Sequence, residues 1–354
     1  APDFMNAPDN TGQRITLRDI GKAIGVSHST VSLALRNHPR ISETMRNKVH
    51  ETAQKMGYTP DPMLAALATY RRNKSDKPIT SSLAWINAWP DPKDLRAHLE
   101  FDCYWKGATK SAKKFGYRLE EFRLDSNFSP RRLHQILSTR GIRGILLPPH
   151  RIQPDWQDFP WENYSVVRFG RTVHTPACHV VTADQVANTI LAYEEIYRRG
   201  YRRIGFVAPN AELKRNGIIF ELGYLGGQRL FDDAAKLPPL LFTRATPQEE
   251  RQILLKNWIK EHKPDAIFTS LTELPDMLAK ENLRVPEDIA LAATTILDTT
   301  ITAGINQHPE EIGRVGLLML NSMINDGSRG IPEIFRQILV EGCWVDGSSL
   351  PPKP

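Results

Sequence analysis

One short predicted helix near the start of the chain carries small and polar side chains at positions suited to nucleic-acid chemistry. Ser27 is a favourable N-cap for a helix over residues 28–35. Helical spacing turns three apolar residues of this helix inward: Val31, Ala34 and Leu35. The major groove of DNA admits such a helix when its outward side chains are small or polar at the N-terminal end. The outward residues that fall there, and are predicted to contact bases, are His28, Ser29 and Leu33.

Two flanking helices complete a helix-turn-helix unit. The first follows a capping box over residues 16–19 and ends at Gly25. The third begins after Ser42, which is a good N-cap, and ends at Gly57. Three short helices with a glycine turn between the first two are typical of this unit.

Positive charge is concentrated in the same segment. The chain of 354 residues has 46 Lys and Arg against 40 Asp and Glu, a formal charge of +6, which is too small by itself to identify a partner. Between Arg14 and Lys55, however, eight basic residues face only three acidic ones. Such a local excess predicts contact with the phosphates of nucleic acid. A solvated three-helix cap without nucleic acid is the alternative.

Composition excludes several other classes of protein. With 40% hydrophobic and 24% charged residues, the chain is neither disordered nor fibrous and can bury a core. No apolar run approaches the roughly 18 residues of a membrane span, so no membrane partner is expected. The three cysteines are far apart and form no C-x-x-C pair, which predicts neither disulfides nor a metal site and fits the reducing cytoplasm. No cofactor is expected.

The remainder of the sequence divides into a short linking segment and a larger body. Asp61 and Pro62 begin a helix of only about two turns, which is too short to be stable without a partner. From residue 79 onward, strand-like runs alternate with amphipathic helices in two successive series, which predicts two parallel α/β sheets. The predicted domains are a disordered tail over residues 1–13, a helix-turn-helix domain over 14–60, a hinge helix and linker over 61–78, and a body over 79–350. Chain crossings expected near residues 177–180, 304–308 and 330–333 divide the body into one lobe of 79–177 with 308–330 and a second of 178–304 with 333–350.

Several stretches of the chain form one recognisable pattern. The first runs without a gap from Ile15 to Val49, opens Ile15-Thr-Leu-Arg-Asp-Ile-Gly-Lys-Ala-Ile-Gly-Val-Ser-His-Ser-Thr-Val-Ser, and is followed by Gly57-Tyr-Thr-Pro60. Weaker landmarks follow in order: Arg199-Gly-Tyr-Arg-Arg-Ile-Gly-Phe-Val207, Leu283-Arg-Val-Pro-Glu-Asp-Ile289 and Gly304-Ile-Asn-Gln307. Together they resemble the lac repressor/purine repressor (LacI/GalR) family of transcription regulators. The resemblance implies an all-α headpiece and a body of two Rossmann-like lobes, similar to the periplasmic sugar-binding proteins.

The same resemblance implies roles for individual residues. It places His28 and Ser29 at the first two base-reading positions, and Leu33 at a third that often carries a polar side chain. Leu33 departs from that pattern and could pack on a thymine methyl or leave its base pair unread. The positions that correspond to phosphate contacts are Ser27, Thr30, Ser32, Arg36 and Arg40. Leu67 matches a leucine that enters the minor groove from the hinge helix, with packing inside a dimer as the alternative.

Candidate ligand residues of the body follow from the strand order. Ligands of open α/β sheets bind beyond the carboxyl ends of the strands. That rule nominates Asn87, Trp89, His150, Arg168, Phe169, Glu273 and Asp298. The aromatic members could stack on a sugar ring or belong to the core. Phe220 stands where sugar-binding members of the family carry an arginine, and their Asn-Asp pair after the later strand is missing, so the identity and even the existence of an effector stay open.

The predicted function is therefore transcription regulation, with repression as the expected sense. A homodimer would read pseudo-palindromic operator DNA, and a small molecule, expected to be carbohydrate-like, would bind between the lobes. The alternative is a cytoplasmic ligand-binding module without affinity for DNA. No enzymatic activity is expected, because the best enzymatic candidate, a helix-turn-helix fused to a sugar kinase, would need a phosphate loop that the sequence lacks.

Overall fold

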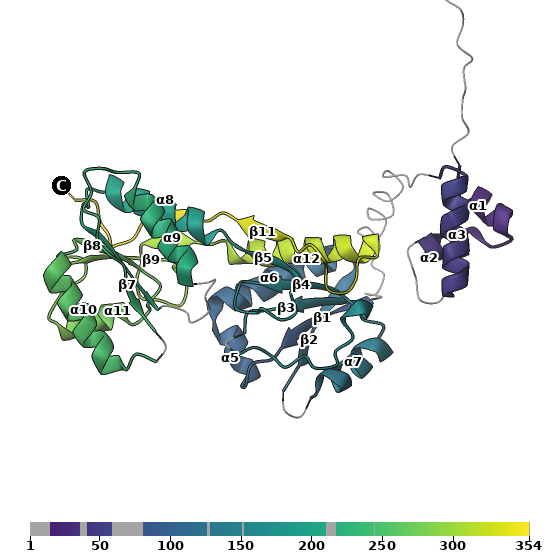
Figure 1. Ribbon diagram of the computed structural model, residues 1–354, viewed down its shortest axis with the longest axis horizontal. Helices are drawn as coiled ribbons and strands as arrows, with labels where there is room; N and C mark the ends of the chain where they lie inside the picture. The colour runs from purple at the N-terminus through teal and green to yellow at the C-terminus, as the bar shows by residue number, and fades with distance from the viewer. Residues whose placement is uncertain are drawn as a thin grey trace, which may run out of the picture. The chain divides into compact units, whose positions relative to one another are not determined.

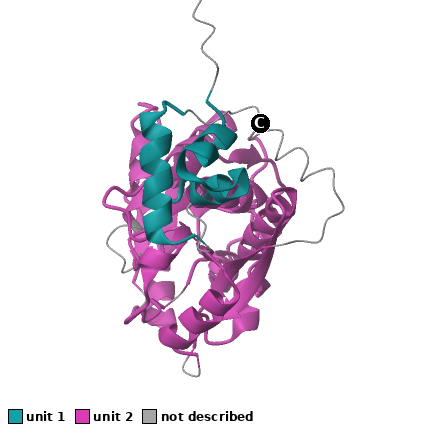
Figure 2. Ribbon diagram, turned by 90° about the vertical axis from the view of Figure 1, so that its right-hand side faces the viewer, with its two compact units in different colours: residues 1–77, 325–328 teal, residues 78–324, 329–354 magenta. Residues whose placement is uncertain are grey.

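The computed structural model describes residues 15–35, 41–58, 81–125, 128–150, 152–209, 217–243 and 245–353. These fall into two compact units (Figure 2), one built from residues 1–77 with 325–328 and the other from residues 78–324 with 329–354. The predicted tail 1–13 and the predicted hinge 61–78 lie outside the described residues, as do three predicted DNA contacts: Arg36, Arg40 and Leu67.

The first unit contains the predicted helix-turn-helix, which is confirmed. Its helices are α1 (Leu17–Ile24), α2 (His28–Leu35) and α3 (Glu43–Lys55). A reciprocal capping box between Thr16 and Asp19 starts α1, and the Ser42 side chain accepts a hydrogen bond from the Met45 backbone at the start of α3. The buried residues that hold the three helices together are Ile20, Val31, Ala34, Val49 and Ala53.

Two glycines shape the turn between α1 and α2. Gly25 ends α1 in the left-handed conformation at φ +76°, which glycine adopts without strain. Gly21 lies so close to the following turn that an added Cβ would be 2.6 Å from the Val26 carbonyl oxygen. The Val26 N–H donates to the Gly21 carbonyl at 2.9 Å. The tight turn therefore depends on having no side chain at residue 21.

The second unit contains two six-stranded sheets (Figure 1), which confirms the predicted pair of α/β lobes. The first sheet is entirely parallel, in the order β11 (Gln337–Val340), β5 (His179–Ala183), β4 (Ser165–Phe169), β3 (Gly144–Leu147), β1 (Ser81–Asn87), β2 (Tyr117–Arg123). Helices α6 (Leu99–Lys114) and α12 (Pro309–Asp326) pack on one face of it. Helix α7 (Pro130–Thr139) and the segment around a short 3₁₀ turn (Trp161–Asn163) cover the other face, and α5 (Pro92–Ala97) precedes α6.

The second sheet repeats this plan with one reversal. Its order is β12 (Cys343–Val345), β10 (Gly304–Asn306), β9 (Ala290–Ala293), β8 (Ala266–Thr269), β6 (Ile204–Pro209), β7 (Leu240–Phe242), and only the β12–β10 pair is antiparallel. Helices α8 (Gln185–Arg198) and α9 (Gly217–Gln228) lie on one face, and α10 (Gln248–His262) and α11 (Leu274–Lys280) on the other.

Two of the three predicted chain crossings are wrong. β5 pairs with β4 and β11, so the chain leaves the first sheet after residue 183 and not near 177–180. β11 also belongs to the first sheet, which moves the last crossing from 330–333 to the residues between β11 and β12. The crossing between β10 and α12 falls near the predicted 304–308. The displaced crossings share one cause: a strand's partner is set by contacts with residues distant in the sequence.

Candidate nucleic-acid interface and effector edge

The start of α2 is fixed by hydrogen bonds within its own first turn. The Thr30 N–H donates to Ser27 Oγ at 3.1 Å, and the two hydroxyl oxygens are 2.9 Å apart. Ser27 therefore caps the helix, as predicted, and each hydroxyl keeps further capacity for a phosphate oxygen. Both residues were predicted phosphate contacts, and a rigid helix start suits that role because phosphate contacts set register.

Burial decides which side of α2 is outward. Val31 and Ala34 are 0% exposed, and this packing leaves His28 and Ser29 exposed at the N-terminal end. Thr30, Ser32 and Leu33 are half-buried. The predicted base readers thus divide into two exposed polar side chains and one half-buried apolar side chain. Imidazole and hydroxyl groups can donate to and accept from base edges, whereas Leu33 offers only apolar contact.

Basic side chains are accessible on the same unit. The exposed ones among its described residues are Arg18, Lys22, Lys48 and Lys55. Asp19, by contrast, is occupied by the cap of α1: its Oδ2 accepts from the Thr16 backbone at 2.8 Å. The Thr16 hydroxyl donates to the same oxygen, and the side-chain and backbone hydrogen bonds from Thr16 together lower the pKa of Asp19. One of the few acidic groups in this region is therefore committed to local structure.

In the second unit, the ends of β1 and β3 are bonded to each other. Asn87 at the end of β1 donates to the carbonyl of Pro92 at 2.9 Å and to Glu121 Oε1 at 2.7 Å. Its Oδ1 accepts from the Trp89 backbone at 3.0 Å. The Ala88 N–H donates to His150 Nε2 at 2.9 Å. The structure thus brings these predicted ligand residues together, but Asn87 has its donors and acceptor engaged within the protein.

The two nominated aromatic residues of this lobe are core residues. Trp89 is 4% exposed, and its indole N–H donates to the Pro149 carbonyl at 2.8 Å. Phe169 is 0% exposed, with its ring centroid 5.5 Å from both Trp85 and Tyr104. Between the two roles that the sequence left open for them, stacking on a sugar and core packing, burial favours packing.

His150 and Arg168 are the nominated residues with unused donors. Because the Ala88 N–H donates to His150 Nε2, the ring proton of the neutral imidazole is on Nδ1. Burial lowers the pKa of His150 to about 4, and the Ile86 carbonyl opposes this shift. Arg168 is 9% exposed, and its Nε donates to the Cys178 carbonyl at 3.2 Å. Within the described residues, His150 Nδ1 and Arg168 Nη1 are buried and have no hydrogen-bond partner.

The nominated residues of the second lobe are dispersed. Phe220 packs in the first turn of α9 against that lobe's core. Glu273 forms an ion pair with Arg251, at 3.5 Å between Oε1 and Nη1. Asp298 reaches the first lobe, where its Oδ1 accepts from the Leu99 N–H at 3.1 Å.

Asp298 therefore caps α6 from the other lobe. The helix has no side-chain cap of its own, because His98 at its N-cap makes no such hydrogen bond. A carboxylate at this end also interacts favourably with the helix dipole. The sequence nominated Asp298 as a ligand residue and gave no sign of this role, since 199 residues separate the two partners.

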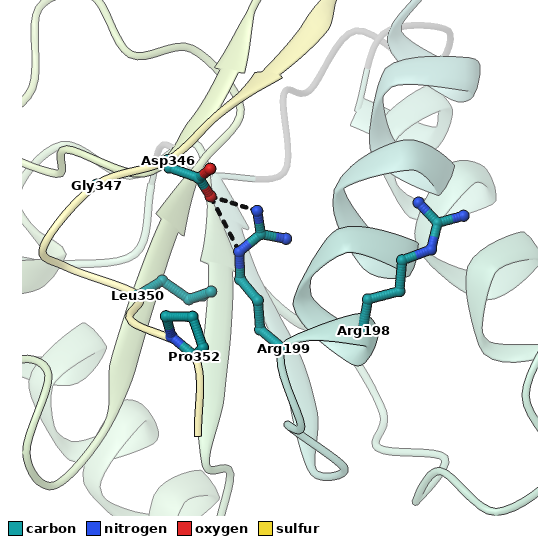
Figure 3. Close-up of a pocket in the computed structure, with 6 residues that line it drawn as sticks. All are labelled: Arg198, Arg199, Asp346, Gly347, Leu350 and Pro352. Atoms are coloured by element: carbon teal, nitrogen blue, oxygen red, sulfur yellow. Dashed lines mark hydrogen bonds and ion pairs between the residues drawn. The ribbon is translucent and has the colours of Figure 1, made fainter. Parts of the chain in front are cut away.

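A pocket of about 450 Å³ lies elsewhere on the second lobe (Figure 3). Its lining residues are Arg198, Arg199, Asp346, Gly347, Leu350 and Pro352. Arg199 Nε donates to Asp346 Oδ1 at 3.1 Å, so the two principal charges of the pocket neutralise each other. The pocket lies where α8 ends and where the antiparallel strand β12 ends, and not at the carboxyl ends of the parallel strands. None of the predicted ligand residues lines it.

The described part of the chain shows no sign of a metal centre or a membrane span. There, no group of three or more His, Cys, Asp or Glu side chains could hold a metal ion. No described helix combines the length and apolar character needed to cross a membrane.

Comparisons with known proteins agree with this architecture. Residues 16–61 match "Bacterial regulatory proteins, lacI family", and residues 193–350 match "Periplasmic binding protein-like domain". The HTH-type transcriptional repressor CytR of Escherichia coli (strain K12) is 24% identical over 335 residues, covering 86% of this chain and 88% of CytR. The transcriptional regulator CelR–cellobiose complex has a TM-score of 0.56 at 18% identity, covering 95% of this chain and 100% of that chain. The lac repressor dimer bound to operator and the anti-inducer ONPF has a TM-score of 0.52 at 16% identity, covering 96% and 99%.

A helix-turn-helix unit combined with a periplasmic-binding-protein-like body defines a DNA-binding transcription regulator. The chain belongs to the LacI/GalR family of these regulators.

Proposed function

We propose that the protein is a repressor that binds a pseudo-palindromic operator as a homodimer in the cytoplasm. The observation that carries this proposal is the geometry of α2, whose capped N-terminal end presents His28 and Ser29 outward. In this proposal His28 and Ser29 read base edges, and Leu33 supplies an apolar contact. Phosphates are held by Ser27, Thr30, Ser32, Arg36 and Arg40, and Leu67 enters the minor groove. The lac repressor comparison, a dimer bound to operator, supports the same arrangement.

We further propose that a small molecule of sugar-like size binds at the carboxyl edges of the two sheets. Support comes from the fold, because open α/β sheets bind ligands at this edge, and from the CelR structure, which is a complex with cellobiose. The edge of the first sheet points toward the second lobe, since β5 leads directly into α8. Of the nominated ligand residues, we retain the two whose side chains have unused donors, His150 and Arg168.

In this scheme the Asp298–Leu99 hydrogen bond couples ligand binding to DNA binding. This hydrogen bond joins the two lobes, so it can be present in one lobe arrangement and broken in another. A ligand needs only a few kcal/mol of preference for one lobe arrangement to shift the population. Because the predicted hinge helix 61–78 is too short to be stable alone, separating two copies of it would weaken the hold on DNA.

Selection of bound sequences from random DNA by the full chain tests this function. We expect enrichment of a two-fold pseudo-symmetric site whose half-sites are spaced as for a dimer. Enrichment of a single, unrepeated half-site would contradict the homodimer. No enrichment even at 50 mM salt would contradict DNA binding and favour the alternative of a ligand-binding module.

A further inference from the structure

The guanidinium of Arg168 is an unneutralised charge inside the first lobe. Arg168 lies in β4 and is 9% exposed. Its Nε donates to the Cys178 carbonyl at 3.2 Å, while Nη1 is shielded from solvent and has no partner among the described residues. A guanidinium cannot shed its proton in a protein, so its donors must be satisfied or the fold is penalised. This position therefore needs an acceptor from outside the described chain.

The surrounding charges increase this need. Burial lowers the pKa of Arg168, the neighbouring Cys178 opposes this, and the positive charge of Arg171 lowers the pKa further. Arg171 is itself partly desolvated, and Asp184 offsets this for Arg171 alone. Among the described residues, no carboxylate acts on Arg168. Two cations thus lie near one another, and among the described residues a carboxylate acts on only one of them.

The position of Arg168 matches the ligand edge of the sheet. Arg168 pairs with Leu147 at the end of β3. Beyond the strands, a Cβ at Gly170 would be 3.4 Å from the ring of Pro149, so the two following loops run side by side. Gly170 follows the last residue of β4 at φ +66° and carries no side chain that could cover the neighbouring guanidinium.

Two more unused donors lie in the same pair of loops. His150 Nδ1 and Thr172 Oγ1 are buried, and neither has a hydrogen-bond partner within the described ranges. The His174 backbone N–H donates to Gln153 Oε1, and the Gln153 side-chain amide donates to the Thr172 carbonyl, which ties the loops together. Among the described residues, this edge therefore offers three buried donors without a partner, one on the cationic Arg168 and two on the neutral His150 and Thr172.

We propose that Arg168 binds an oxyanion, a carboxylate or a phosphate, on the effector, and that His150 and Thr172 donate to the same ligand. This rests on the proposed effector site at this edge. The planar fork of a guanidinium matches the two oxygens of a carboxylate or phosphate group, and the pairing is strongest where water is excluded. The effector is then an acidic small molecule, such as a sugar acid or a sugar phosphate, and not a neutral sugar.

Calorimetry and thermal unfolding of the full chain test this inference, at constant ionic strength. The probes are glucuronate, glucose 6-phosphate, sulfate and, as the neutral parent, glucose. We expect at least one of the organic acids to bind at least 10-fold more tightly than glucose, and sulfate to raise the unfolding temperature of the wild type more than that of Arg168→Met. A response to glucuronate alone assigns a carboxylate, and a response to glucose 6-phosphate alone assigns a phosphate.

Arg168→Met removes the charge but keeps an unbranched apolar side chain of related length. We expect its unfolding temperature without ligand to equal or exceed that of the wild type, because an uncompensated buried charge is lost. Its affinity for the acidic probe should fall at least 10-fold. Arg118→Met, at an exposed arginine on β2 whose side chain is 68% exposed, is the matched control and should leave both quantities unchanged.

Three results would overturn the inference. They are equal anion affinity in Arg168→Met, a wild type that responds to glucose but to neither acid, and a wild type in which neither acid nor sulfate gives a shift beyond that of the variant. None of them affects selection of operator DNA, so a palindrome selected alongside such a result would leave the proposed function standing. Conversely, failed DNA selection with intact anion binding would overturn only the repressor proposal.

Discussion

On helix α2, the candidate contact residues His28 and Ser29 are exposed, and buried neighbours on the same helix hold them in place. At the carboxyl edge of the first sheet, the corresponding candidates are themselves buried: Asn87 is 1% exposed, His150 2% and Arg168 9%. The two regions therefore differ in the solvent exposure of their candidate contact groups. One leaves polar groups in water, and the other removes them from water before any ligand arrives.

This difference changes how a candidate residue is recognised. On an exposed helix face, position alone nominates a contact, because water satisfies every donor until DNA replaces it. At a buried edge, a nominated residue must also have a donor or acceptor to spare. Asn87 fails that test because its amide is used by Pro92, Glu121 and Trp89, whereas Arg168 passes it.

The largest expected difference between the two regions is in their response to salt. DNA affinity should fall on the order of 10³-fold between about 50 and 200 mM salt if several phosphates are neutralised per dimer. Binding of a small ligand at the buried edge should change far less, since buried pairs are screened weakly. Gel-shift titration and calorimetry over the same salt series measure both. A flat response of DNA affinity would remove the electrostatic basis of the proposed interface.

Substitution of the exposed readers should separate binding from stability. His28→Ala or Ser29→Ala should cost about 1–3 kcal/mol of operator affinity, roughly 5- to 150-fold, and change the preferred bases, with the unfolding temperature unchanged. Val31→Ala is the contrasting control: it removes buried methyl groups of the same helix and should destabilise the headpiece by about 1–3 kcal/mol while the selected motif stays the same. An unchanged motif from the His28 and Ser29 variants would show that other residues read the bases.

The same contrast explains what the sequence could and could not predict. The headpiece was readable because its determinants are local: Thr16, Ser27 and Ser42 each cap a helix through a residue three positions away. The crossings of the body were misplaced because β5 is assigned to its sheet by β4 and β11, and β11 lies more than 150 residues further along the chain. Alternation of strands and helices reveals the class of fold but not each strand's neighbour.

The candidate ligand residues show the same limit. The rule about carboxyl strand ends brought Asn87, Trp89, His150 and Arg168 to one edge, as expected for parallel strands. The rule could not predict on which face of the sheet each residue lies. Phe169, which follows Arg168, packs in the core on the opposite face. Which donors remain free depends on hydrogen bonds across the fold, and no spacing in the sequence encodes those.

Removing the cap between the lobes should have a moderate effect. Asp298→Gly deletes the acceptor for the Leu99 N–H, and glycine tolerates the backbone φ of +56° at this position. We expect a loss of about 0.5–2 kcal/mol, the usual range for an N-cap, measured as a lower unfolding temperature of the full chain. Asp298→Asn keeps an acceptor and also tolerates this backbone conformation, so it should behave nearly as the wild type.

If Asp298→Gly is as stable as Asp298→Asn, the cap contributes nothing and the lobes are held by other contacts. If it is destabilised but operator affinity responds to the effector as before, the contact is structural and takes no part in coupling. Either result would mean that the second lobe affects stability or ligand response through contacts other than the one at the N-terminal end of α6.

The smallest expected effect concerns Glu100, on the first turn of α6. Burial raises its pKa, Asp298 adds to this, and the hydrogen bond of 2.6 Å from the Tyr104 hydroxyl opposes it. Because the folded protein holds this proton more tightly than the unfolded chain, the stability associated with Glu100 is present at acidic pH and is lost as pH rises through the folded pKa. Glu100→Gln keeps an acceptor for Tyr104 and cannot ionise. Its unfolding temperature, relative to the wild type, should therefore increase from about pH 4 toward neutral pH.

Glu281→Gln supplies a control of opposite sign. Hydrogen bonds from Lys256 and Gln252 lower the pKa of Glu281, so its favourable contribution is present at neutral pH and is lost on acidification. That variant should be less stable than the wild type near neutral pH and should approach it at about pH 4. Parallel unfolding curves for the two variants across this range would contradict the assignment. Opposite slopes would show that the folded protein favours the protonated form of Glu100 and the ionised form of Glu281, as burial of the first and the hydrogen bonds to the second predict.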